Sequence, residues 1–143
     1  MTDREKPPLP SLDSFPVRAF DTIRFGDTDM LGHVNNAVFS TYLETGRTQL
    51  LRSGDRPMAP DGTFFSLARI VLDFRAELIW PGEVEVGTRV VKVGRSSLTL
   101  DQALYQDKKC VATAETVMVL VNRQTRRSTP LPPDLAARLG ALS

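Results

Sequence analysis

The spacing of hydrophobic and polar positions changes twice along the chain. Residues 17–25 (VRAFDTIRF) are rich in β-branched and aromatic side chains, which is typical of a strand. From Asn36 to Arg52 the apolar positions recur at helical spacing, which predicts one long helix. Asn35 or Asn36 suits its N-cap, and the Ser-Gly pair at 53–54 suits its end.

Strand patterns dominate the chain after this helix. In the first of them, 64–79, apolar residues alternate with Asp73, Arg75 and Glu77, which predicts a long strand with one wet face. Tight connections join the later strands, as hairpins would. A short helix is expected near the C-terminus, after the prolines. The four expected strands are 64–79, 83–93, 96–106 and 110–122.

The long helix carries a glycine at its centre, Gly46. A mid-helix glycine costs roughly 1 kcal/mol relative to alanine, so another element is expected to pack closely there. The order of strand, helix and four strands lacks βαβ alternation and therefore excludes a doubly wound parallel sheet. We expect an α+β domain in which an antiparallel five-stranded sheet wraps around one long central helix.

Composition narrows the class of protein. The chain has 143 residues, enough for one domain at 16–143 after a charged, Pro-rich segment at 1–15, which we expect to be a flexible tail without the apolar core of a signal peptide. The net charge of +1 gives no footprint for nucleic acid, and no apolar run is long enough to cross a membrane. Cys110 is the lone cysteine, which favours a reducing, cytoplasmic location and a buried thiol. With a single histidine as well, the chain lacks the ligands of a usual zinc site, so no metal is expected.

The segment RFGDTDMLGHVNN at 24–36 concentrates the candidate chemistry. It leads directly into the helix, whose N-terminal N–H groups and positive dipole end suit a developing negative charge. Asp29 lies on the turn that feeds this helix start, where its carboxylate can activate water or attack a carbonyl carbon itself. The competing interpretation is that both aspartates only build the turn. We adopt that interpretation for Asp27, whereas the spacing alone leaves both interpretations open for Asp29.

The extended pattern RFGDTDMLGHVNNAVFSTYLETGR resembles the signature of hotdog-fold acyl-CoA thioesterases of the 4-hydroxybenzoyl-CoA thioesterase group. The matching skeleton is Arg-x-x-Asp-x-Asp, then Gly-His-Val-Asn-Asn, then an aromatic-bearing helix with Glu and Arg. The resemblance extends over about residues 16–135 and implies the hotdog fold. It also implies hydrolysis of an acyl-CoA to acid and thiol without cofactor or metal, in a dimer or a dimer of dimers with its sites between subunits.

The resemblance also implies roles for individual residues. Asp29 matches the catalytic carboxylate, and the backbone amide near Asn36 matches the group that polarises the thioester carbonyl. His33 either assists the chemistry or only satisfies loop carbonyls. One of the two asparagines, Asn35 or Asn36, caps the helix, and the other binds substrate or Asp29. Asn35 is a candidate for the contact with substrate. At the turn KVGRSSL, Arg95 and Ser96 are the expected contacts for the coenzyme A phosphates, although relatives carry a denser basic run there.

Other functions are weighed against hydrolysis. Enoyl-thioester hydratases of this fold place a histidine five positions after the aspartate, whereas His33 follows Asp29 by four positions and Asp27 by six. A non-catalytic acyl-CoA binder with the same fold stays open, because fold does not imply function. An oligomerisation module without a ligand would leave the Gly-His-Val-Asn-Asn turn unexplained. The acyl group, and coenzyme A as opposed to acyl carrier protein, also stay open.

Overall fold

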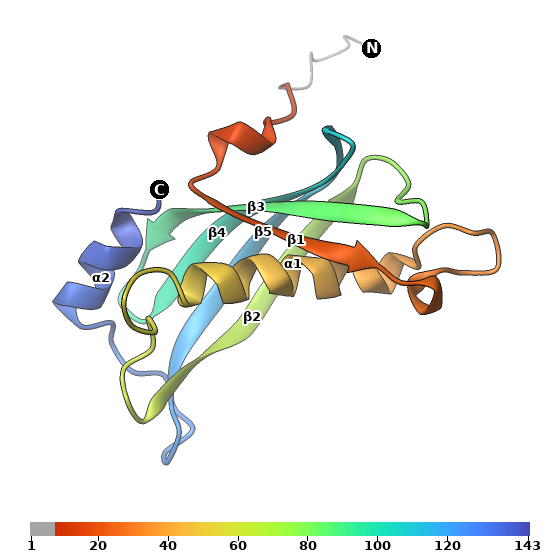
Figure 1. Cartoon of the computed structure of the whole chain (residues 1–143). Helices are drawn as coiled ribbons and strands as arrows, with labels where there is room; N and C mark the ends of the chain where they lie inside the picture. The colour runs from red at the N-terminus through yellow and green to blue at the C-terminus, as the bar shows by residue number, and fades with distance from the viewer. Residues whose placement is uncertain (1–7) are drawn as a thin grey trace, which may run out of the picture.

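The computed structural model of the protein describes residues 8–143 (Figure 1). Five antiparallel strands form one sheet in the order β1-β3-β4-β5-β2, and the long helix α1 lies across one face of it. This is the α+β arrangement expected from the order of elements. The strands are β1 (Val17–Ile23), β2 (Thr63–Phe74), β3 (Gly82–Val93), β4 (Ser97–Gln106) and β5 (Lys109–Asn122), and the α-helices are α1 (Asn36–Leu51) and α2 (Pro133–Gly140).

The central glycine of α1 lies where the sheet approaches most closely. A Cβ atom added to Gly46 would stand 2.5 Å from Cγ1 of Val86 and 2.7 Å from Oγ1 of Thr88. Gln102 lies beside them and donates to the carbonyl of Leu43, so sheet and helix are also hydrogen-bonded in the interior. The close packing predicted from this glycine is therefore confirmed.

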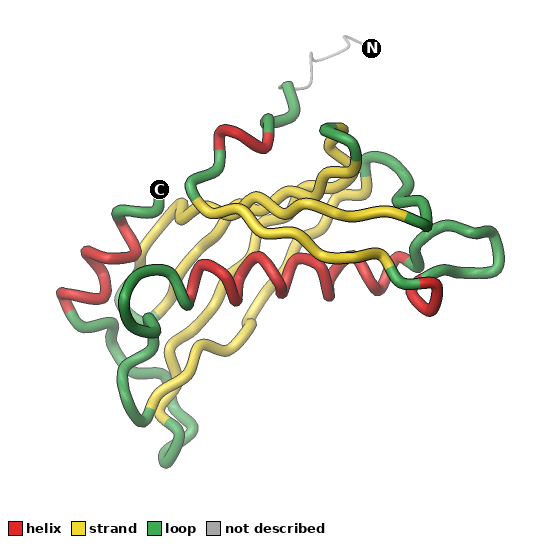
Figure 2. The backbone as a smooth tube through the Cα atoms, in the orientation of Figure 1, coloured by secondary structure: helices red, strands yellow, loops and turns green. Residues whose placement is uncertain are grey.

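The core forms two clusters along α1. The first contains Phe39, Tyr42 and Leu43 from the first half of the helix, with side chains of β3, β4 and β5. The second surrounds Leu50 at the end of the helix and includes Leu135 and Leu139 of α2. Figure 2 shows that α2 lies at one end of α1, while the loop that precedes α1 lies at the other end.

The sequence-based strand 64–79 was wrong at its end, because β2 stops at Phe74. The N–H groups of Arg75 and Ala76 both donate to the single carbonyl of Val111, at 2.8 and 3.0 Å, so the ladder with β5 stops there. Alternation continues past the strand because Leu78 is still buried in the first cluster. The chain then joins the turn before α1, where the N–H of Val34 donates to the carbonyl of Leu78 at 2.9 Å.

Part of the expected N-terminal tail packs on the sheet. Residues 1–7 lie outside the described residues, whereas Leu12–Ser14 form a 3-10 turn and the ring of Phe15 is buried against Gly87. The hydroxyl of Tyr105 donates to the carbonyl of Pro10. The packed domain therefore begins earlier than residue 16. Within residues 8–143, no helix combines the length and apolar character needed to span a membrane.

Candidate active site at the start of the long helix

Asp27 builds the turn between β1 and α1. Its Oδ2 accepts from the N–H of Arg24 at 2.9 Å and from the hydroxyl of Tyr42 at 2.7 Å. Its carbonyl accepts from the N–H of Asn35 at 2.8 Å. Burial, together with the Asp27 carboxylate, raises the pKa of the Tyr42 phenol. Asp27 therefore has the structural contacts expected of it.

Asp29 lies on the exposed part of the same turn. Its Oδ1 accepts from the N–H of Leu31 at 2.8 Å and from the N–H of His33 at 3.3 Å. Its own N–H donates to the carbonyl of His33 at 2.7 Å, and Gly32 takes a positive φ of 82° within the loop. These bonds fix the carboxylate relative to the backbone without burying it.

The two asparagines have separate positions. Asn35 is the N-cap, and its side-chain oxygen accepts from the N–H of Ala37 at 3.0 Å. Asn36 is the first helical residue, and within residues 8–143 its N–H donates to no protein acceptor, as is usual in a first turn. The amide that the resemblance assigns to the carbonyl is thus available for a ligand.

A pocket of about 390 Å³ opens beside this helix start. It brings together three of the residues expected to act in catalysis, Asp29, His33 and Asn36. Apolar side chains form its wall, among them Phe39 and Phe74, whose rings meet edge to face at 5.0 Å. The pocket therefore combines a carboxylate, an imidazole and a helix N-terminus with an apolar wall. The full lining is Asp29, Leu31, His33, Val34, Asn36, Phe39, Phe74, Arg75, Ala76 and Glu77.

The other expected contacts do not reach this pocket. Asn35 is occupied as the cap, and Arg95 and Ser96 lie on the turn between β3 and β4. The opposite end of β3 is the one near the site, since Gly82 pairs with Ile23 at the end of β1. Twelve residues of strand, about 40 Å if straight, separate the two ends. Within one subunit the structure does not bring Arg95 and Ser96 to Asp29.

Two charged residues of the pocket were not anticipated as site residues. The carboxylate of Glu77 meets Nε2 of His33 at 3.1 Å, and Arg75 donates to Oγ1 of Thr113 at 3.2 and 3.1 Å. In the sequence both are ordinary members of an alternating wet face. No local pattern distinguishes them, because their place in the pocket depends on β2 ending at Phe74.

Metal and thiol chemistry find little support in the described residues. No three His, Cys, Asp or Glu side chains gather in residues 8–143 as a metal ion would require. Cys110 is half-buried on β5, its thiol donates to the carbonyl of Ala112, and burial raises its pKa. A raised pKa disfavours the thiolate that a nucleophile needs.

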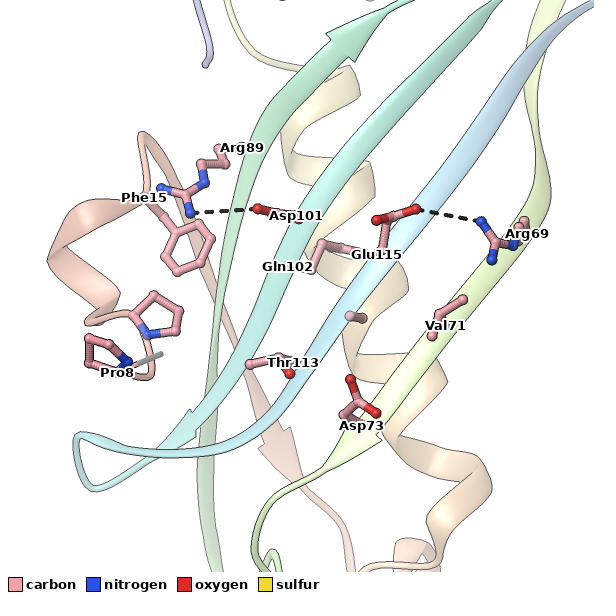
Figure 3. Close-up of a pocket in the computed structure, with 12 residues that line it drawn as sticks. Pro8, Phe15, Arg69, Val71, Asp73, Arg89, Asp101, Gln102, Thr113 and Glu115 are labelled. Carbon is pink, nitrogen blue, oxygen red and sulfur yellow. Dashed lines mark ion pairs between the residues drawn. The ribbon is translucent and has the colours of Figure 1, made fainter. Parts of the chain in front are cut away.

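A second hollow, of about 460 Å³, lies on the face of the sheet opposite α1 (Figure 3). Ion pairs cross it between Arg89 and Asp101 at 3.5 Å and between Arg69 and Glu115 at 3.5 Å. None of the six expected site residues is among those that line it. Its charges already neutralise one another in pairs, so we place the candidate chemistry in the smaller pocket.

Comparison with known proteins identifies the family of the chain. The family model of the thioesterase-like superfamily matches residues 23–139. A 1,4-dihydroxy-2-naphthoyl-CoA hydrolase of Synechococcus elongatus is 28% identical over 118 residues, which cover 79% of this chain and 87% of the relative.

Solved structures extend the likeness over most of the chain. A thioesterase from Thermus thermophilus complexed with coenzyme A and Zn is 36% identical, with a TM-score of 0.76 over 90% of this chain and 94% of the other. A predicted thioesterase from Bacillus stearothermophilus is 25% identical, with a TM-score of 0.78 over 88% and 95%. The family resemblance, the fold and the enzyme class expected from the sequence are thus confirmed. The chain belongs to the thioesterase-like superfamily and is a thioester hydrolase with the hotdog fold.

Proposed function

We propose that this protein hydrolyses an acyl-CoA thioester to the free acid and coenzyme A, with Asp29 as base or nucleophile. The observation that carries the proposal is the pocket that Asp29 shares with Asn36 at the N-terminus of α1. The names of the relatives support coenzyme A as the thiol, since one is a CoA hydrolase and another binds coenzyme A.

The helix start supplies the electrostatic part of the reaction. Attack on a thioester places negative charge on the carbonyl oxygen, and the N–H of Asn36 points out of the first turn of α1 with the positive end of the helix dipole behind it. Removal of a single oxyanion donor costs roughly 3–4 kcal/mol of transition-state stabilisation in enzymes where it has been measured.

Asp29 supplies the other part, by one of two routes. As a base, its carboxylate takes a proton from water while the water oxygen bonds to the carbonyl carbon and the thiolate leaves. As a nucleophile, it bonds to that carbon, expels the thiolate and leaves a mixed anhydride for water to cleave. Hydrogen bonds of the turn use Oδ1, and within the described residues Oδ2 stays free to serve either route.

A single turnover in ¹⁸O-labelled water detects an anhydride that water cleaves at the aspartyl carbon. If Asp29 is the nucleophile, cleavage of the anhydride at the acyl carbon leaves the label in the product, and cleavage at the aspartyl carbon leaves it in Asp29. If Asp29 is a base, the label appears only in the product. Label in the Asp29 peptide therefore establishes the anhydride route.

We further propose a homodimer or homotetramer with the pocket at a subunit interface. Within residues 8–143, β2 forms one edge of the sheet with β5 as its one neighbouring strand, so its other side has no strand paired with it along Thr63–Phe74. Around the pocket, Met30, Leu31 and Phe74 expose large apolar side chains. A second copy that paired along β2 would cover both features, and light scattering would then give twice or four times the chain mass of 15.8 kDa.

Contacts to the nucleotide stay predictions. Arg95 and Ser96 would need a further subunit to reach a substrate in this pocket, because they lie at the far end of β3. The cytoplasmic location likewise stays a prediction from the lone cysteine. A non-catalytic acyl-CoA binder is the alternative function, and it would use the same pocket without turnover.

The deciding experiment measures thiol release from a panel of acyl-CoA and acyl carrier protein thioesters. We expect the wild type to turn over at least one of them and Asp29→Asn to lower kcat by at least about a hundredfold. The matched control is Asp73→Asn, which removes an exposed carboxylate from β2 outside this pocket. Binding without turnover would favour the binder, and an active Asp29→Asn variant would move the chemistry to another residue.

A further inference from the structure

Glu77 has no part in the mechanism above, yet its carboxylate lies in the same pocket and contacts the only histidine of the chain. Oε2 of Glu77 stands 3.1 Å from Nε2 of His33, and both side chains line the pocket with Asp29. The two residues come from different loops, one before α1 and one after β2. The pair therefore exists only because the fold brings these loops together.

Both loops are held firmly where they meet. His33 forms an antiparallel bridge with Ile79, and the N–H of Val34 donates to the carbonyl of Leu78. Gln106 of β4 fastens Ile79 from the other side, accepting from its N–H at 3.0 Å and donating to its carbonyl at 2.8 Å. The backbone that follows Glu77 is thus bonded to the backbone of His33 and Val34, which holds the two loops together beside the pair.

The contact favours one tautomer of a neutral imidazole. A carboxylate has no hydrogen to donate and attracts one, so the proximity of Glu77 favours the hydrogen on Nε2 and leaves the lone pair on Nδ1. An acidic partner behind a histidine fixes its tautomer and ring orientation in the same way in hydrolase triads. The other charged groups at this pocket are Asp29 and Arg75, and Arg75 is engaged with Thr113 and Asp73.

We propose that Glu77 is a positioning residue, which holds His33 with its Nδ1 lone pair available to the water that hydrolyses the substrate. The inference rests on the proposed function. Either route through Asp29 needs one water molecule to attack a carbonyl carbon, and Nδ1 accepts a hydrogen bond from that water. In the anhydride route, Nδ1 takes the proton as the water oxygen bonds to the acyl carbon and the carboxylate of Asp29 leaves.

Kinetics test whether Glu77 acts through His33. We expect Glu77→Ala to lower kcat by about ten- to a hundredfold with little change in KM, since a misplaced catalytic group costs about this much. In Glu77→Gln, kcat should fall less, because the amide oxygen can still accept a hydrogen bond from Nε2. In a His33→Ala background, Glu77→Ala should have no further effect on kcat. The matched control is Glu115→Gln, which breaks a similar surface ion pair, with Arg69, on the other face of the sheet.

A second measurement does not depend on activity. Because His33 is the only histidine, the ¹⁵N signals of its ring can be read without ambiguity in a labelled protein. At a pH where the ring is neutral, we expect the Nε2–H tautomer alone in the wild type and averaged nitrogen shifts of two tautomers in Glu77→Ala.

The two measurements separate failure of this inference from failure of the proposed function. Identical ring shifts in wild type and Glu77→Ala overturn the positioning role, as does a further loss of kcat in the His33→Ala background. If the wild type releases no thiol from any substrate, the proposed function fails, and the role of His33 in holding water fails with it. The ring shifts then still decide whether Glu77 holds the imidazole.

Discussion

The two ends of α1 differ in almost every physical respect. At its C-terminal end, Leu50 is fully buried and α2 closes the sheet with Leu135 and Leu139. At its N-terminal end, irregular loops hold polar groups around an open pocket, and Met30 and Phe74 expose apolar surface. One end of α1 is covered by α2, and the other end has exposed apolar side chains around an open pocket. The packed end and the candidate site thus lie at opposite ends of the same helix.

The largest loss of stability is expected from a cavity in the packed core at the C-terminal end of α1. Leu139→Ala removes a fully buried side chain from α2 and should lower the free energy of unfolding by about 3 kcal/mol. Urea denaturation measures the loss. The value of kcat at a temperature where the variant stays folded should match the wild type, because the site lies at the other end. A large fall in kcat would show that the two ends are coupled.

A smaller effect is expected at the middle of the helix. Gly46→Ala gains about 1 kcal/mol in helix propensity but drives a methyl group into Val86 and Thr88, so we expect a net loss of about 2 kcal/mol. Gly26→Ala is the matched control, because its Cβ would meet no atom within 4 Å. Thermal denaturation of both variants compares them, and equal stability would show that the sheet moves away from α1 at little cost.

Tyr42 ties the helix to the turn that carries Asp29. Tyr42→Phe removes the hydrogen bond to Asp27 and should cost about 1.5 kcal/mol at neutral pH. Because the pKa of Tyr42 is higher in the folded state, its contribution is full below the unfolded value of about 10 and falls as the pH rises above it.

Denaturation at several pH values tests this sign. The wild type should lose stability from about pH 10 upward more steeply than Tyr42→Phe. Part of the slope should remain in the variant, since burial also raises the pKa of Tyr105. If stability depended on pH with the same slope in both proteins, a raised pKa of Tyr42 would be contradicted.

The smallest effect is expected from the helix cap. Asn35→Ala should cost about 1 kcal/mol of stability, because the N–H of Ala37 loses its acceptor. Asn35→Ser keeps an acceptor oxygen and should recover most of that loss, as circular dichroism through a thermal melt would measure. If Asn35→Ala also lowers kcat at a temperature where the variant stays folded, the cap holds Asn36 in place for the substrate.

Local patterns predicted most of the fold because most elements here are determined locally. The period of apolar residues placed α1 to within a residue, and Gly46 indicated the close approach of a sheet that lies far away in the sequence. The end of β2 was missed for the opposite reason. Its alternation continues to Leu78, and only the capture of the Arg75 and Ala76 N–H groups by Val111 ends the strand.

The candidate site was predictable only where it is contiguous in sequence. Asp29, His33 and Asn36 lie within one turn, so a single motif indicated all three, and the structure gathers them in one pocket. Glu77 reaches the pocket from another loop, and a charged residue on an alternating strand gives no sign of such a destination. Arg95 is the opposite case, because the sequence suggested a role for it and the position did not follow. A basic turn predicts phosphate binding, but the sequence does not tell in which subunit the bound substrate would lie.

The Asp29 carboxylate bonds the turn through one oxygen and is proposed to act in catalysis through the other, which has a consequence for how such a protein could change its function. One oxygen of this side chain is already occupied in closing the loop, accepting from the amides of Leu31 and His33. Asparagine keeps an oxygen for those two amides, and a single base change in the codon converts aspartate to asparagine. After gene duplication, one mutation in one copy could therefore turn a thioesterase into a thioester-binding protein whose loop stays folded.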